Sequence, residues 1–112
     1  MKQAKTQPYS RYSADAVQLM SSLIKVARKE RKLTAQDVAD RAGISRGLVQ
    51  RIEKGDMKCS IGAVFEVAAI LGVRLFDADE HSLSKELRQN KDKLALMPKS
   101  IRKKTRVVND DF

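Results

Sequence analysis

The sequence predicts an all-α fold, a small bundle of four to five helices around one aliphatic core. Apolar residues recur at three- and four-residue steps through most of the chain, which is the period of an amphipathic helix. Several of these segments follow a Ser or Thr and end at a Gly, the residues that commonly begin and end helices. The chain has no Trp and few aromatics, so Leu, Ile, Val and Ala must fill the core.

The first helix is expected over residues 15–32, after a polar and basic arm at residues 1–14 that we expect to be flexible. Its apolar stripe consists of Leu19, Leu23, Ile24 and Ala27. The second helix is expected over residues 35–42, where Thr34 can cap the start and Asp37 can complete a capping box. Gly43 suits the left-handed residue that ends such a helix.

A third helix is expected over residues 46–54, with Ser45 as its cap and Gly55 at its end. Two short helices separated by three residues have the spacing of a helix-turn-helix. A fourth helix follows Ser60 and stops at Gly72. Its apolar face consists of Val64, Val67, Ala68 and Leu71.

Beyond the fourth helix the pattern changes. Residues 73–78 alternate apolar and polar side chains in part and predict a short strand. Residues 82–97 predict a weakly amphipathic helix that ends at Pro98. Residues 99–112 offer little to bury and predict a basic, disordered tail. Residues 79–112 are therefore expected to form a charged extension.

The net charge of +9 favours a polyanionic partner, either nucleic acid or an anionic membrane. No apolar stretch approaches the length of a membrane span, and the N-terminus lacks the apolar centre of a signal peptide. We therefore expect a cytoplasmic protein with no membrane contact.

Candidate catalytic or metal-binding groups are scarce. One cysteine, Cys59, and one distant histidine, His81, are too few for a zinc site. No nucleophile has an evident base partner, and no glycine-rich phosphate loop is present. We expect a protein that is not an enzyme and needs no cofactor.

The run from Leu33 to Gly55 resembles the Cro/CI repressor family, also called the XRE family. The resemblance depends on small Ala39 where the helices approach, Gly43 at the turn and Ile44 after it. It implies a lambda-repressor-like fold for residues 15–78 and sequence-specific binding to double-stranded DNA. The alternative is a helical hairpin of the same periodicity without DNA contact.

In such domains the second helix of the pair lies in the major groove. By position, the residues that the resemblance implies for DNA contact are Thr34, Gln36, Ser45, Arg46, Gly47, Gln50, Arg51, Lys54 and Lys58. Many members have Gln where this chain has Ala35, so the usual role of that Gln is not carried over to Gln36. Similar domains also tie the first helix to the recognition helix by an ion pair, here Arg28 with Glu53.

The strand-like segment at residues 73–78 and the basic tail resemble antitoxins of the HipB type. This likeness implies a homodimer on a palindromic operator, strand pairing between subunits, and a HipA-like kinase toxin as partner. Two alternatives remain open: a free-standing repressor or activator without a toxin, and an adaptor that binds protein or RNA.

Overall fold

The computed structural model describes residues 9–103 of the 112-residue chain. This part contains five helices and no β-strand, which confirms the all-α prediction. The helices are α1 (Arg11–Glu30), α2 (Ala35–Ala42), α3 (Arg46–Glu53), α4 (Ile61–Ile70) and α5 (Glu80–Ala95). They fall into two compact units, one ending at Asp77 and the other starting at Ala78.

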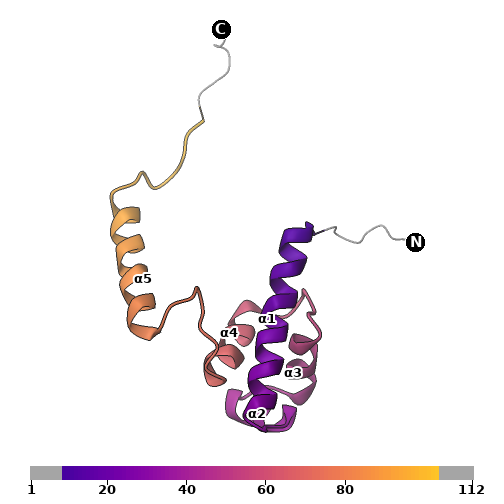
Figure 1. Ribbon diagram of the computed structural model, residues 1–112. Helices are drawn as coiled ribbons and strands as arrows, with labels where there is room; N and C mark the ends of the chain where they lie inside the picture. Colours follow the sequence, from indigo (N-terminus) through magenta and orange to yellow (C-terminus); the bar gives the residue numbers. More distant parts are fainter. Residues whose placement is uncertain (1–8, 104–112) are drawn as a thin grey trace, which may run out of the picture. The chain divides into compact units, whose positions relative to one another are not determined.

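Helices α1 to α4 enclose a core built from short aliphatic side chains, as the composition predicts (Figure 1). Helix α2 packs on α3 and α4, and α3 packs on α1. The buried residues are Ile24, Ala27, Val38, Ala39, Val49, Ile52, Val67, Ala68 and Leu71. Each of the four helices contributes to this cluster, so removal of any one would expose the others.

Helix α1 begins at Arg11, four residues earlier than expected, because the Ser10 hydroxyl accepts a hydrogen bond from the backbone N–H of Ser13. Residues 11–14 of the predicted flexible arm are therefore helical, and residues 1–8 lie outside the described part.

The predicted apolar stripe of α1 is wrong in part. Ile24 and Ala27 are buried, but Leu19 and Leu23 are exposed. The buried polar residue Ser21 takes the core-facing position instead, because its hydroxyl donates a 2.7 Å hydrogen bond to the backbone carbonyl of Ile52.

The strand predicted over residues 73–78 is not formed. Phe76 and Asp77 have φ angles of 57° and 53°, two successive left-handed residues that reverse the chain and prevent an extended run. The Phe76 ring meets Phe65 edge to face, with ring centroids 6.0 Å apart. The segment that resembled a strand therefore contains a turn, and Phe76 in that turn contacts Phe65 of α4. Without a strand at these residues, the predicted strand pairing between subunits has no structural support.

Helix α5 starts two residues before the predicted boundary, because the Asp79 side chain accepts from the backbone N–H of Ser82 at 2.8 Å. It ends at Ala95, shortly before Pro98, and buries no residue within its own unit. The chain beyond it is described only to Lys103. Most of the predicted tail, with its basic cluster and Phe112, therefore lies outside the described residues.

Candidate nucleic-acid interface

The turn between α2 and α3 is built as the sequence predicts. Gly43 takes a left-handed φ of 70°, and the backbone N–H of Ile44 donates to the carbonyl of Ala39 at 3.1 Å. A Cβ at Gly43 would meet nothing within 4 Å, so the backbone angle, not space, favours glycine here. Val38 and Ala39 are fully buried, which allows the two helices to approach closely.

Capping side chains fix the first turn of each helix. Thr34 and Asp37 form the predicted capping box: the Asp37 carboxylate accepts from the Thr34 N–H at 2.8 Å, and the Thr34 hydroxyl accepts from the Asp37 N–H at 3.0 Å. The bond from the Thr34 backbone lowers the pKa of Asp37 below its ordinary value. The Ser45 hydroxyl accepts from the Leu48 N–H at 3.1 Å. Thr34 and Ser45, two of the predicted contact residues, are therefore the N-caps that hold the first turns of α2 and α3.

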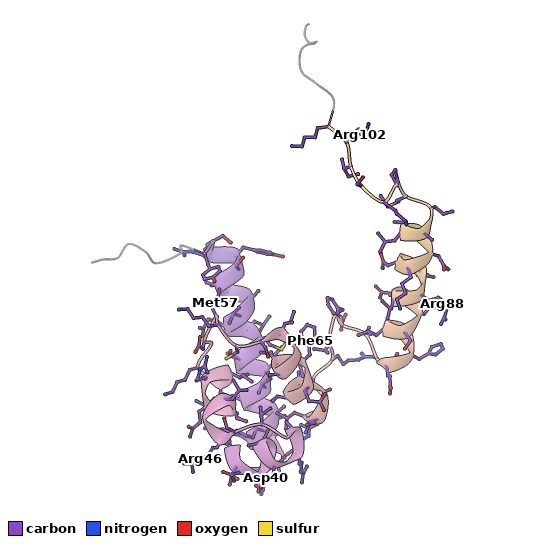
Figure 2. All side chains as sticks on the ribbon, turned by 180° about the vertical axis from the view of Figure 1, so that it is seen from behind. Asp40, Arg46, Met57, Phe65, Arg88 and Arg102 are labelled. Carbon is purple, nitrogen blue, oxygen red and sulfur yellow. The ribbon has the colours of Figure 1, made fainter. Side chains whose placement is uncertain are left out.

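Helix α3 has two unlike faces. Val49 and Ile52 are buried in the core, whereas the opposite side is exposed and carries mainly hydrogen-bond donors. The exposed residues of this helix and its C-cap are Arg46, Gly47, Gln50, Arg51 and Lys54. Figure 2 shows Arg46 at the end of the bundle where Asp40 also lies, well away from Met57. The predicted contact residues that belong to α3 and its C-cap therefore share one exposed face of the helix.

An ion pair attaches this helix to α1, as the resemblance implies. Arg28 Nε lies 2.6 Å from Glu53 Oε2, and Nη2 lies 2.9 Å from Oε1, a two-pronged contact. Only 15% of the Arg28 side chain and 7% of the Glu53 side chain are exposed. Arg28 also donates a hydrogen bond to the backbone carbonyl of Leu33. The hydrogen bond to Glu53 raises the pKa of Arg28. Together with the bond from Ser21 to Ile52, the pair fixes the orientation of α3.

Asp56 is a member of this surface that the sequence reasoning missed. Its carboxylate accepts from Arg51 Nε at 2.8 Å and from the backbone N–H of Lys58 at 2.8 Å. Both hydrogen bonds lower the pKa of Asp56, and the bond from the Lys58 N–H has the larger effect. The hydrogen bond between Arg51 and Asp56 in turn raises the pKa of Arg51. The contact crosses the left-handed Gly55, so helix spacing gave no signal for it.

The two arginines of the face therefore differ. Arg51 is oriented by Asp56, with its terminal amino groups left for another ligand, whereas Arg46 has no ion-pair partner within residues 9–103. Gln36, on α2, donates to Asp40 at 2.8 Å. This pair, at the helical spacing of four residues, could have been found from the sequence.

Other chemistry is not indicated in the described part of the chain. Residues 9–103 contain no group of three His, Cys, Asp or Glu side chains that could hold a metal ion. Cys59 is half-buried and packs against the core. Among the same residues, no helix is both long and apolar enough to cross a membrane.

Two short helices joined by a left-handed glycine turn, the second with one face exposed, define a helix-turn-helix protein. The family model for the helix-turn-helix matches residues 24–77. A relative from Methanocaldococcus jannaschii, described as an uncharacterized HTH-type transcriptional regulator, is 34% identical over 58 residues, which are 52% of this chain and 88% of the relative. No solved structure gives a significant match. This chain belongs to the helix-turn-helix family.

Proposed function

We propose that this protein is a transcriptional regulator that binds double-stranded DNA with α3 in the major groove. The observation that carries the proposal is the exposed face of α3, where Arg46, Gly47 and Gln50 lie together on a helix fixed by its caps and by Arg28. A rigid helix presenting donors at its N-terminal end is how helix-turn-helix proteins contact base edges. The relative from Methanocaldococcus jannaschii is described as a transcriptional regulator, which supports the same role.

The chemistry of the face fits base recognition. An arginine such as Arg46 can bond to O6 and N7 of guanine, and Gln50 can bond to N6 and N7 of adenine. Gly47 projects no side chain between them and permits close approach of the backbone. The bond to Asp56 holds Arg51 at its Nε while the terminal amino groups can still face a guanine or a phosphate.

Phosphate contacts are proposed on either side of α3. The N-terminus of α2 presents backbone N–H groups beside Thr34 and Gln36, where the helix dipole favours an anion. Lys54 and Lys58 follow the recognition helix and are exposed. Such contacts set the register of the protein on DNA without reading sequence.

Arg46→Ala tests the proposal directly. If Arg46 reads a base, the variant loses about 1 to 3 kcal/mol of binding free energy on the cognate site, with relaxed preference at one base pair. The measurement is affinity for a selected duplex and for random duplex at one salt concentration. Arg88→Ala, on α5, removes the same charge from an exposed helix and is the control. An equal loss on both duplexes would assign Arg46 to phosphate, and no loss on either would contradict the proposal.

The proposed regulator acts as a homodimer on a palindromic operator, because two copies related by a two-fold axis present two recognition helices to two half-sites. The half-sites would be about 34 to 36 Å apart. Binding to a full operator should then be tighter than to an isolated half-site, which a titration of both duplexes measures.

We propose a free-standing regulator in preference to an antitoxin. The antitoxin interpretation, with a HipA-like kinase toxin as partner, depended on a strand at residues 73–78, and a turn at Phe76 and Asp77 interrupts that segment. Its other support, the basic tail, lies mostly outside the described residues. Co-purification of a kinase encoded beside this protein in its native host would restore the antitoxin role. The adaptor alternative has less support, because the exposed arginines lie on the face that would enter DNA.

A further inference from the structure

Helix α1 carries a row of apolar side chains that its own unit leaves exposed. The row, here called the α1 stripe, consists of Tyr12, Ala16, Leu19, Leu23 and Val26. Leu19 is 60% exposed, Leu23 43% and Val26 53%. These residues are separated by steps of four, three, four and three, which is the spacing by which one helix packs lengthwise against another. An apolar row of this regularity over 15 residues differs from the scattered apolar residues of an ordinary surface.

The stripe is bordered by hollows that suit a second helix. One hollow is lined by Ala16 and Met20 of α1 and by Phe65 of α4. Another is lined by Leu23 and Val26 of α1 and by Leu71 after α4. Side chains from an opposing helix therefore have recesses beside the stripe in which to pack. The first recess is mainly apolar, and the second also has Glu30, Arg31 and Arg74 in its lining.

We propose that the α1 stripe is a homodimer interface in which α1 pairs antiparallel with α1 of a second copy of this chain. In that arrangement Leu19 faces Leu23 of the second copy, and Ala16 faces Val26. Each contact occurs twice, as a two-fold axis requires. The proposal deepens the dimer part of the proposed function by naming its surface, and it does not depend on DNA binding.

Charge selects a second copy of this chain, in the antiparallel direction, as the occupant. The solvent side of the stripe is flanked by Asp15, Ser22 and Lys29, at steps of seven residues. When the leucines are paired as above, Asp15 lies opposite Lys29 of the second copy, and Lys29 lies opposite its Asp15. Neither side chain has an ion-pair partner within the described residues of its own chain. The charges that flank the stripe are therefore complementary in sign across the two-fold axis.

The size of the surface predicts a weak dimer. Helix α1 has 20 residues, so it is about 30 Å long, and one face of it falls short of the roughly 800 Å² that each partner buries in a standard interface. We expect dissociation in the micromolar range, which is compatible with a dimer that DNA stabilises.

Sedimentation of the full chain at micromolar concentrations tests the proposal. Leu19→Ser should weaken the dimer at least tenfold, because one substitution removes two buried leucines from the interface. Leu87→Ser is the matched control, since Leu87 is 51% exposed on α5 and lies outside the stripe. Circular dichroism should show both variants folded. A wild-type monomer at every concentration, or a dimer that dissociates with Leu87→Ser and not with Leu19→Ser, would overturn the proposal.

Charge reversal and cross-linking test the direction of the pairing. Lys29→Asp should weaken the dimer, and the double variant Asp15→Lys with Lys29→Asp should restore it, because the reversed charges again face each other. The two-fold axis passes beside Ser22, so Ser22→Cys in a Cys59→Ser background should cross-link with a short bifunctional maleimide, whereas Lys25→Cys should not. Failure of rescue together with cross-linking only at position 25 would exclude this pairing. The affinity of Leu19→Ser for an isolated half-site should equal that of the wild type, whether or not the proposed interface is correct. This measurement therefore separates a failure of the interface from a failure of DNA binding.

Discussion

Gly47 and Gly62 occupy equivalent positions in α3 and α4, each two residues after a capping serine. A Cβ at Gly62 meets nothing within 4 Å, and one at Gly47 meets only the Ser45 hydroxyl at 3.9 Å. Neither glycine has a left-handed backbone, so the fold itself requires glycine at neither position. Gly62 therefore serves as a reference for what Gly47 does beyond folding.

Gly47→Ala should stabilise the fold yet weaken DNA binding. Alanine in place of glycine favours the helix by up to about 1 kcal/mol, and the same gain is expected for Gly62→Ala. Only the methyl group at residue 47 would enter a packed contact with DNA, where crowding costs about 1 to 3 kcal/mol. Thermal unfolding and duplex affinity of the two variants check this. Equal DNA affinity of both would mean that α3 does not approach DNA at Gly47.

Among individual residues, the sequence predicted the roles of those that belong to a recurring motif. The pairing of Arg28 with Glu53, the cap at Thr34 and the turn at Gly43 were all predicted and are present. Asp56 was not predicted, because its contacts to Arg51 and Lys58 depend on how the chain turns at Gly55.

Helix α2 is bounded at both ends by local interactions, which explains why its bounds agreed with the prediction. The capping box fixes its start and Gly43 its end, and both act within a few residues of the chain. The turn at residues 75–78 is the opposite case, because β-branched and aromatic content gave no sign of its two left-handed residues. The periodicity of α1 likewise placed Leu19 and Leu23 in one stripe with Ile24 and Ala27, and it gave no sign that the bundle leaves the two leucines exposed.

The capping box predicts a dependence of stability on pH. The folded pKa of Asp37 is lowered by the Thr34 backbone, so its ionised form stabilises the fold above its unfolded pKa of about 3.9. That contribution disappears as the pH falls through the lower, folded value. Asp37→Asn should therefore lower the melting temperature at pH 7, and its difference from wild type should shrink below about pH 4. Asp40→Asn, which keeps an acceptor for Gln36, is the control. A pH-independent difference would contradict an ionic cap.

The whole molecule is strongly basic, with 23 Lys and Arg against 14 Asp and Glu, but its positive charge is not confined to the proposed interface. Helix α5 also exposes lysines, including Lys91 and Lys93, in the unit that lacks the helix-turn-helix. Overall charge therefore predicts affinity for polyanions but does not locate it. The location was predicted only by the motif and by the exposed face that it places on α3.

The salt dependence of DNA affinity separates the contribution of overall charge from that of the proposed contacts beside α3. Each phosphate neutralised steepens the log-log dependence of affinity on salt by about 0.9, so loss of the proposed contacts at Lys54 and Lys58 should reduce the slope by about 2. The double variant Lys54→Gln with Lys58→Gln tests this, and the Lys58 backbone can keep its bond to Asp56. Lys91→Gln with Lys93→Gln removes the same charge from α5 and should leave the slope nearly unchanged. If both variants reduce the slope equally, DNA is attracted by the net charge of the chain, and Lys54 and Lys58 make no specific phosphate contacts.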